Sequence, residues 1–353
     1  MKMEPVRIGI IGCGVIAQRH LKGAAGSPLI DVVAVADIRE DAARQTARTF
    51  GVATVYHSAE ALLNDERVEA VVLAMPAAPR TKIALRALAK GKHLLTEKPV
   101  AMSALEVRKI IAARRGRVAA CCSSRMRFQP SARAASEFIA TGALGAIRLL
   151  QCRCLYPDGG APKSAPPTWR LRTVENGGGI LMNWGCYDLD YLLGLCGWTL
   201  RPKLVLAQTW TIAPQFASHI APDSDAETYY AAMIRCEKGE MISLERGEYC
   251  AAAEEDSWRI VGTKGSLRLT MTPAQGKKLY HDDGSKGNGI ETRVLWKGDE
   301  NYDTANFGPI RDFAQAIREK RSPMTTLEQA LVLQQISDAI YASAARGKAI
   351  TLR

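Results

Sequence analysis

The chain has 353 residues, of which 47% are hydrophobic and 24% are charged, so we expect a globular protein of two domains and exclude a disordered chain. Its formal net charge is +11, but the lysines and arginines are scattered and form no basic run interleaved with aromatic residues. This distribution favours a solvated basic surface and excludes nucleic-acid binding.

The cysteines and the N-terminal residues indicate the cellular compartment of the protein. There are nine cysteines, with no CxxC pair, which is typical of reduced, mostly buried thiols. The histidines are dispersed, so no metal site is expected. MKMEP lacks the pattern of a secretory leader, and the longest apolar stretch contains Asp188 and Asp190. We therefore expect a cytoplasmic protein that does not contact a membrane.

The first predicted element is a buried strand over residues 6–11, VRIGII, followed by the turn Gly12-Cys-Gly14-Val-Ile-Ala17 and a helical stretch. This strand, G-x-G-x-x-A turn and helix predict a dinucleotide site. Gly12 permits the turn, Gly14 lets the backbone approach a pyrophosphate, and Ala17 lets helix and strand pack closely.

A second strand over residues 31–37 ends in Asp37, 20 residues after Ala17. A carboxylate at this place is expected to accept hydrogen bonds from the ribose hydroxyls and to repel a 2′-phosphate, which favours NAD over NADP. Arg39 could offset that preference, so NADP stays possible. The alternative is that Asp37 only caps the next helix.

The alternation of strands and helices continues through residue 121 and predicts a doubly wound parallel sheet. Further strands are expected over residues 68–76 and 92–99. Ligands of such sheets bind beyond the carboxyl ends of the strands. Glu97 and Lys98, at the end of the last of these strands, are therefore expected where a nicotinamide meets its substrate.

From residue 122 the pattern changes to strand-like runs joined by turns, which predicts a mainly antiparallel sheet with one covered face. The runs lie at 146–156, 202–212, 228–237 and 240–250, followed by SWRIVGT and GSLRLTM. Two stretches, 159–168 and about 272–305, are rich in Gly, Pro or charge. We expect them to be loops that fold over the substrate or contact a neighbouring chain.

Residues 177–192, GGGILMNWGCYDLDYL, are apolar apart from polar residues that include Asn183, Tyr187 and Asp190. Their spacings of four and three place these three side chains on one face of an α-helix. The face is either a substrate wall or a set of satisfied core residues.

Several motifs together resemble the Gfo/Idh/MocA oxidoreductase family. They are the turn at Gly12, Glu97-Lys98-Pro99, RFQP (127–130), TGALGAI (141–147), VGTKGSLRL (261–269) and the glycine-led segment at 177. The resemblance implies an α/β fold: a Rossmann domain over residues 1–121, then an α+β domain with a large open, mainly antiparallel sheet over 122–353. It also implies a homodimer or homotetramer.

The resemblance places Asn183 and Tyr187 where the family usually has an aspartate and a histidine facing the substrate, with Lys98 opposite. We expect Tyr187 to be the acid/base, Lys98 to lower its pKa and bind the reacting oxygen, and Asn183 to hold a hydroxyl. Lys98-Pro99 is a candidate cis bond. Three further residues are candidate substrate contacts: Trp169 by stacking, Arg170 by hydrogen bonds, and Arg127, for which a structural ion pair is the favoured alternative.

The family's asparagine and histidine after the third long strand are missing here. The chain has Pro76-Ala77-Ala78-Pro79-Arg80 instead, and Arg80 is expected either to meet an anionic substrate group or to reach solvent. The complete set of expected cofactor-binding residues is Gly12, Gly14, Val15, Ile16, Ala17, Asp37, Arg39, Pro76, Glu97 and Lys98.

The function that follows is NAD(P)-dependent hydride transfer to or from a hydroxyl-bearing carbon of a sugar, cyclitol or sugar derivative. Two alternatives stay open. One is an NAD-dependent glycosidase or lyase that oxidises the sugar only transiently. The other is a dinucleotide-sensing protein whose catalytic residues have changed.

Overall fold

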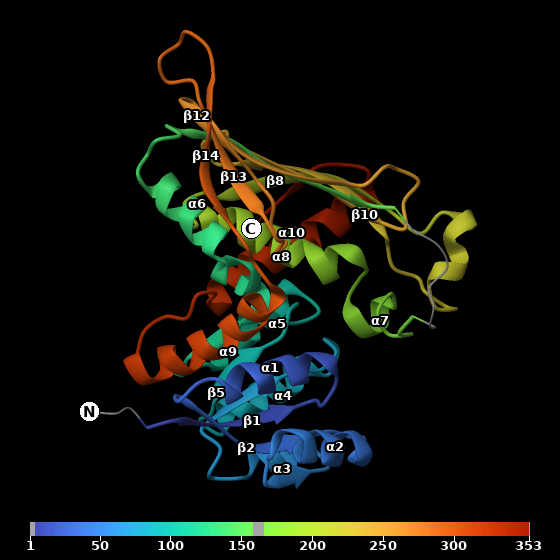
Figure 1. Cartoon of the computed structure of the whole chain (residues 1–353). Coiled ribbons are helices and arrows are strands. Elements are labelled where there is room, and N and C mark those ends of the chain that lie inside the picture. The colour runs from blue at the N-terminus through green and yellow to red at the C-terminus, as the bar shows by residue number, and fades with distance from the viewer. Residues whose placement is uncertain (1–3, 158–165, 353) are drawn as a thin grey trace. The chain divides into compact units, whose positions relative to one another are not determined.

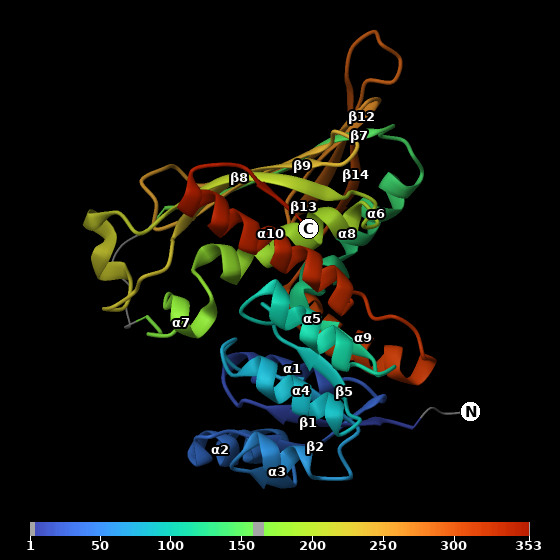
Figure 2. The same ribbon diagram turned by 180° about the vertical axis from the view of Figure 1, so that it is seen from behind.

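The computed structural model describes residues 4–157 and 166–352, and the chain divides into two compact units. Unit 1 comprises Met1–Arg125 and Tyr302–Leu331, and unit 2 comprises Met126–Asn301 and Val332–Arg353. The chain thus leaves unit 1, builds most of unit 2, returns to unit 1 and ends in unit 2 (Figures 1 and 2).

Unit 1 contains a six-stranded sheet in the order β3-β2-β1-β4-β5-β6, with every neighbouring pair parallel. This is the doubly wound order of a dinucleotide-binding fold. The strands are β1 (Val6–Ile11), β2 (Ile30–Ala36), β3 (Thr54–Tyr56), β4 (Ala70–Leu73), β5 (His93–Thr96) and β6 (Ala119–Cys121).

Alternation along each strand distributes side chains between two apolar cores, one on each face of this sheet. On β4, Val72 belongs to one core whereas Val71 and Leu73 belong to the other. Both faces are buried, so the strands read as continuous apolar runs. The helices of this part are α1 (Val15–Ala25), α2 (Glu40–Phe50), α3 (Ala59–Leu63), α4 (Arg80–Ala89) and α5 (Ala104–Ala113).

A late helix, α9 (Tyr302–Glu319), completes unit 1 although it lies far along the chain. Its Ile310 and Phe313 are fully buried in the same core as Ile8 of β1, and Gly23 of α1 approaches it so closely that an added Cβ would lie 3.0 Å from Phe307 Cα. The single domain boundary predicted after residue 121 does not include this return.

Unit 2 is built on a nine-stranded sheet in the order β14-β13-β12-β11-β7-β10-β9-β8-β15. Its pairs are antiparallel except β7 with β10, so the mainly antiparallel open sheet is confirmed. The strands are β7 (Ile147–Tyr156), β8 (Pro202–Trp210), β9 (Tyr229–Cys236), β10 (Met241–Glu248), β11 (Glu255–Gly262), β12 (Gly265–Leu269), β13 (Lys277–Asp283), β14 (Glu291–Gly298) and β15 (Ile350–Thr351).

Both ribbon views place α6, α8 and α10 along one face of this sheet (Figures 1 and 2). The opposite face exposes Leu206, Trp210 and Met233, which are 54%, 46% and 45% accessible. The helical elements here are η1 (Cys122–Phe128), α6 (Pro130–Ala140), α7 (Thr173–Asn176), the π-turn η2 (Leu181–Gly185), α8 (Cys186–Leu195), η3 (Pro214–His219) and α10 (Leu327–Arg346); η1 and α10 each cross a unit boundary.

The expectation that residues 272–305 form a loop is wrong. They contain the hairpin of β13 and β14 and the beginning of α9. On β13, Lys277, Leu279 and His281 alternate with more exposed neighbours, which is a strand pattern hidden by its polar composition. The predicted loop at 159–168 lies mostly outside the described residues.

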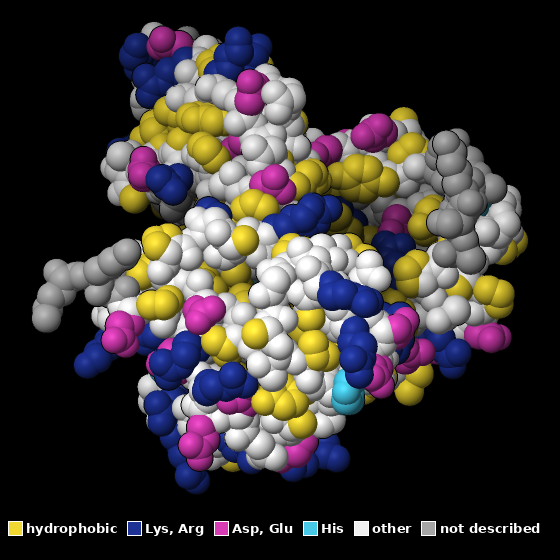
Figure 3. Space-filling model, turned by 60° about the horizontal axis from the view of Figure 1, so that its bottom comes forward, with side chains coloured by type: hydrophobic (Ala, Val, Ile, Leu, Met, Phe, Trp, Pro, Cys, Tyr) yellow, Lys and Arg dark blue, Asp and Glu magenta, His cyan; other side chains and the backbone are white. Residues whose placement is uncertain are grey.

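The described surface and thiols agree with the composition. Lys and Arg side chains are spread among acidic and apolar ones on the face shown in Figure 3. Within the described ranges, no helix combines the length and hydropathy that crossing a membrane requires. All nine cysteines are thiols rather than disulfides, and eight of them are buried.

Candidate cofactor and substrate sites

Gly12 is required by the fold of unit 1 itself. It follows β1 with φ +95°, and a Cβ added there would lie 2.3 Å from the carbonyl oxygen of Ala74. Its N–H donates to Ala36 O at 2.8 Å. The turn therefore joins the ends of three neighbouring strands, β1, β2 and β4.

Gly14 differs from Gly12 because the protein does not require a glycine there. Its φ is −77°, and none of the described residues places an atom within 4 Å of a Cβ added to it. Gly14 is also the N-cap of α1, whose first turn lacks an acidic residue and a side-chain cap within the described chain. Open space beside a helix N-terminus that has no side-chain cap fits a pyrophosphate.

Asp37 ties the end of β2 to the same turn. Its Oδ2 accepts a hydrogen bond from Cys13 N at 2.7 Å, and its Oδ1 accepts one from Arg39 N at 2.8 Å. The first bond links the carboxylate to the glycine turn. The second bond reaches only the N–H of Arg39, the N-cap of α2, which has no side-chain cap, so the capping alternative is wrong. The side chain of Arg39 is 66% exposed.

The other expected cofactor residues of unit 1 divide into exposed and packed ones. Ala17 is fully buried in the core under β1, as helix–strand packing requires. Val15 is 78% exposed and Pro76 is exposed after β4. Ile16 is only partly buried against the core. Val15, Ile16 and Pro76, with Gly12, Gly14 and Asp37, lie at the carboxyl edge of the parallel sheet, where sheets of this kind bind their ligands.

Glu97 is an anchor after β5 rather than an exposed group. It is 4% exposed, and its Oε1 accepts hydrogen bonds from His20 Nε2 at 2.8 Å and Arg125 Nη2 at 2.6 Å. Burial alone would raise the pKa of Glu97, but the charges of Arg125, His20 and Lys98 hold this pKa well below its usual value. The carboxylate stays charged and fixes the backbone that carries Lys98.

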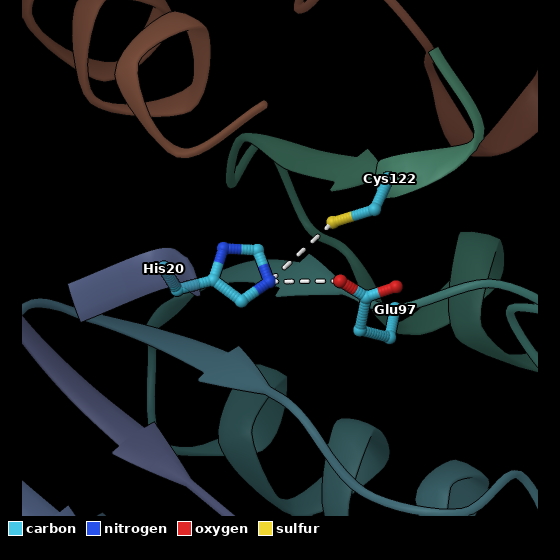
Figure 4. Close-up of side chains that lie close together, drawn as sticks. All are labelled: His20, Glu97 and Cys122. Carbon is cyan, nitrogen blue, oxygen red and sulfur yellow. Dashed lines mark hydrogen bonds and ion pairs between the residues drawn. The ribbon is translucent and has the colours of Figure 1, made fainter. Parts of the chain in front are cut away.

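Figure 4 shows His20, Glu97 and Cys122 pointing toward one another, a set of three possible metal ligands. The guanidinium of Arg125 on the same Glu97 oxygen already balances the carboxylate and repels a cation. Burial raises the pKa of Cys122 well above its ordinary value, and Glu97 raises it further. The same nitrogen of His20, Nε2, faces both Glu97 and the thiol. In a nucleophilic triad, the histidine binds the nucleophile with one ring nitrogen and the carboxylate with the other. The cluster therefore fits an ion-pair anchor.

Arg80 neither reaches solvent nor presents its head to a ligand. It is 3% exposed, and its guanidinium donates to three backbone carbonyls, including Glu97 O at 2.7 Å; the other two acceptors are Met75 O and Pro99 O. Both expectations for Arg80 are thus wrong, because the guanidinium satisfies carbonyls that follow β4 and β5. The Lys98-Pro99 bond within this segment is cis, and Lys98 itself is half-buried.

In unit 2, close backbone contacts explain the glycines before the polar stripe. A Cβ added to Gly179 would lie 1.8 Å from Glu227 O. The Glu227 carboxylate accepts hydrogen bonds from Gly179 N and Leu181 N, each at 3.0 Å, and from the Tyr341 hydroxyl at 2.9 Å. Sequence reasoning missed Glu227, because nothing in its local pattern connects it to this turn.

The stripe does not lie on one continuous α-helix. Asn183 belongs to the π-turn η2, whereas Tyr187 and Asp190 belong to α8. Such π-turns occur often at functional sites. Asn183 is half-buried, and Tyr187 is 5% exposed.

Asp190 pairs with Arg127 Nε at 2.5 Å and is fully buried. The guanidinium of Arg127 also lies over the Trp198 ring, 5.8 Å from its centroid. This geometry supports the structural alternative for Arg127.

Of the other expected substrate contacts, Trp169 is 42% exposed, as a stacking surface requires. Arg170 donates to the Glu248 carboxylate, so a substrate would have to share its guanidinium. A further pair, Asp188 with Arg246, is almost completely buried. The sequence shows an aspartate inside an apolar helix and an arginine inside an alternating strand. Nothing in the local pattern predicts that these two residues pair with each other.

Comparison with known proteins matches the two parts of the chain to two family models. Residues 6–122 match a family model described as an oxidoreductase family with an NAD-binding Rossmann fold, and residues 132–268 match the GFO/IDH/MocA C-terminal domain. A dTDP-3,4-didehydro-2,6-dideoxy-alpha-D-glucose 3-reductase of Actinomadura kijaniata is 32% identical, covering 97% of this chain and 96% of that protein.

D-glucoside 3-dehydrogenase of Escherichia coli K12 is 25% identical, covering 100% of this chain and 99% of that protein. Among solved structures, levoglucosan dehydrogenase in complex with NADH and levoglucosan has a TM-score of 0.85 at 23% identity, covering 99% of each chain. At that identity, the structural match concerns the fold.

We predict opposite behaviour for two alanine substitutions in the glycine turn. Gly12→Ala should lower the free energy of unfolding by about 2 kcal/mol or more, because the left-handed backbone and the contact with Ala74 both oppose a side chain. Gly14→Ala should change it by less than about 0.5 kcal/mol, yet raise the dissociation constant for NAD by about tenfold or more. Denaturant unfolding and calorimetric titration measure the two effects. Unchanged NAD affinity in folded Gly14→Ala would contradict this cofactor position.

We predict that Glu97→Gln lowers the free energy of unfolding by about 3–5 kcal/mol near neutral pH, because it leaves Arg125 buried without its counter-charge. The pKa of Glu97 is lowered on folding, so its contribution is present above the unfolded value of about 4.3 and is lost as pH falls through the lower folded value. The difference from wild type should therefore shrink in acid. Glu40→Gln, which breaks an exposed pair with Arg44, is the control and should not change stability measurably. Equal effects of the two substitutions on the free energy of unfolding would contradict the stabilising role of Glu97.

Proposed function

Because this chain belongs to the Gfo/Idh/MocA oxidoreductase family, we propose that it transfers a hydride between NAD and a hydroxyl-bearing ring carbon of a sugar or sugar derivative. The supporting observation is the carboxyl edge of the parallel sheet. There Gly14 leaves open space at the N-terminus of α1, Asp37 follows β2, and Glu97 fixes the segment of Lys98 after β5.

The chain's own residues supply the proton chemistry. NAD, when bound, accepts or returns the hydride. Oxidation of a carbinol also needs a base for the hydroxyl proton, and Tyr187 takes this role in our proposal, because Asn183 cannot accept a proton. A tyrosine ordinarily titrates near pH 10. The ammonium of Lys98, which we assign to the same hydroxyl, favours the phenolate.

Position 3 of a pyranose ring is the proposed site of oxidation. The names of the Actinomadura kijaniata reductase and the Escherichia coli dehydrogenase both specify that position. Trp169 stacks on the sugar and Asn183 holds a hydroxyl in this proposal, whereas Arg170 binds substrate only by sharing its guanidinium with Glu248. Arg127 serves as the ion-pair partner of Asp190.

Among cofactors, we propose a preference for NAD over NADP. The two Asp37 oxygens that bind Cys13 N and Arg39 N keep further lone pairs for ribose hydroxyls, and their charge opposes a 2′-phosphate. Arg39 is exposed and could reduce this preference without reversing it.

The first test measures nicotinamide absorbance with NAD⁺ and then NADP⁺ across sugars, cyclitols, sugar acids and glycosides. We expect sustained NADH formation with a pyranose or pyranoside, slower when carbon 3 carries deuterium. Consumption of a glycoside without net NADH would instead indicate an enzyme that oxidises its substrate transiently to cleave it. Tight NAD binding without any turnover would indicate a sensor.

We predict that Tyr187→Phe lowers kcat by about 10²–10⁴-fold, the usual contribution of a positioned acid/base group. Lys98→Ala should be similarly damaging, and the double variant no worse than the worse single one, because the two side chains act on one proton transfer. Asn183→Ala should raise KM more than it lowers kcat. Near-normal turnover by Tyr187→Phe combined with an inactive Lys98→Ala would make Lys98 the sole proton carrier.

We also propose that the exposed face of the nine-stranded sheet binds a second copy of this chain in the cytoplasm. On this face Leu206 of β8 pairs in register with Met233 of β9, which pairs with Ser243 of β10. Half-exposed apolar side chains in adjacent register form a surface that favours burial. The nine thiols suit a reducing compartment.

Met233→Glu should therefore convert a dimer or tetramer into a smaller species, because it places a charge in the buried contact. Sedimentation velocity of both proteins measures the effect. Leu105→Glu, at a 63% exposed position on α5 of unit 1 and therefore outside this sheet, is the control. A wild-type protein that sediments as a monomer at micromolar concentration would exclude the interface.

A further inference from the structure

The ion pair between Asp188 and Arg246 is buried within unit 2 and joins α8 to β10. Arg246 Nε and Nη2 donate to the two oxygens of Asp188, each at 2.6 Å, and the side chains are 1% and 0% exposed. The hydroxyl of Tyr230 donates to the same carboxylate at 3.3 Å. Burial alone would lower the pKa of Arg246, but the carboxylate of Asp188 raises this pKa well above its ordinary value. The guanidinium is therefore charged.

The same guanidinium also faces two aromatic rings. Its Cζ lies 5.0 Å from the centroid of Trp184 and 5.8 Å from that of Tyr156. Asp188 holds one edge of the guanidinium plane, so the cation cannot turn away from Trp184. A planar cation fixed in this way limits how the indole can tilt.

Trp184 in turn contacts Tyr187. Their ring centroids are 5.7 Å apart at an interplanar angle of 69°, an edge-to-face arrangement. Trp184 lies in the π-turn and Tyr187 in the first turn of α8. The indole therefore meets the Tyr187 ring on one side and the Arg246 cation on another.

Stability alone gives little reason for a charged pair at this place. Well-packed apolar residues often replace a buried ion pair with no loss of stability, or with a gain. Apolar residues could not, however, replace a guanidinium that is fixed by a bidentate bond to Asp188 and makes a cation–π contact with Trp184. The stripe prediction also did not include Asp188, because it lies outside the face shared by Asn183 and Tyr187.

We propose that Arg246, oriented by Asp188, is a positioning residue that sets the orientation of Tyr187 through Trp184. This inference rests on the proposed role of Tyr187 as the acid/base. Arg246 needs no contact with substrate or cofactor to act in this way. Its effect falls on the alignment of the phenol with the hydroxyl proton, and hence on kcat rather than on KM.

The test compares two neutralised ion pairs. Arg246→Met with Asp188→Asn removes the charges and leaves Tyr230 an acceptor. Lys277→Met with Glu300→Gln does the same to another buried pair of unit 2, whose Glu300 accepts from Ser131 N. Thermal unfolding should report folded proteins in both cases. We expect only the first double variant to lower kcat, by roughly tenfold to a hundredfold, with KM changed less than about threefold.

Trp184 supplies the second arm of this test. Trp184→Leu should reproduce the loss of kcat, and Trp184→Phe should recover part of it, because a ring again contacts Tyr187. In protein labelled with 5-fluorotryptophan, the resonance that disappears in Trp184→Phe identifies this indole among six. That resonance should shift or broaden when Arg246 and Asp188 are neutralised and should not move in the Lys277 and Glu300 control.

Two outcomes would overturn the inference. One is equal kinetics of the two neutralised pairs, and the other is a folded Trp184→Leu variant with wild-type kcat. Tyr187→Phe separates this failure from failure of the proposed function. If Tyr187→Phe is inactive while the Trp184 and Arg246 variants are fully active, only the positioning role is wrong. If Tyr187→Phe is fully active, the acid/base assignment is wrong, and the positioning role falls with it.

Discussion

A carboxylate that stays charged inside unit 1 determines the shape of the carboxyl edge of the parallel sheet. Glu97 is bound by Arg125 and His20, so the chain that leaves β5 is pinned at its first residue. Arg80 then binds the carbonyl oxygens on both sides of Lys98. Buried polar groups are costly unless they are hydrogen-bonded. Here the hydrogen bonds of Glu97 and Arg80 fix the backbone on both sides of Lys98.

Unit 2 uses a comparable arrangement. The Glu227 carboxylate binds the N–H groups that open the π-turn, and Asp188 with Arg246 lies under its far end. In both units a buried acidic side chain supports a short segment with unusual backbone geometry, and that segment carries the polar residue of interest. These polar residues, Lys98 and Asn183, are half-buried.

Periodicity predicted the elements and the ends of strands, which is why Asp37 and Glu97 were placed correctly after β2 and β5. It could not predict partners far along the chain. His20 and Arg125 are 77 and 28 residues from Glu97, and no local pattern connects them. The hairpin of β13 and β14 was missed because its alternation places Lys277 and His281, rather than apolar residues, on the buried side. The π-turn was missed because spacings of three and four suit an ordinary α-helix.

The return of α9 to unit 1 has a consequence for how the protein forms during synthesis. Ile310 and Phe313 fill the same core as Ile8 and Ile10, yet they are translated about 300 residues later. Domains generally fold as units in the order of synthesis, but here the dinucleotide-binding half lacks one wall of its core until most of the other half has left the ribosome. Residues of α1 and α2 cover part of this apolar face from the start, but the part that Ile310 and Phe313 cover stays exposed until α9 has been made. A chain cut after residue 121 would keep that part exposed permanently.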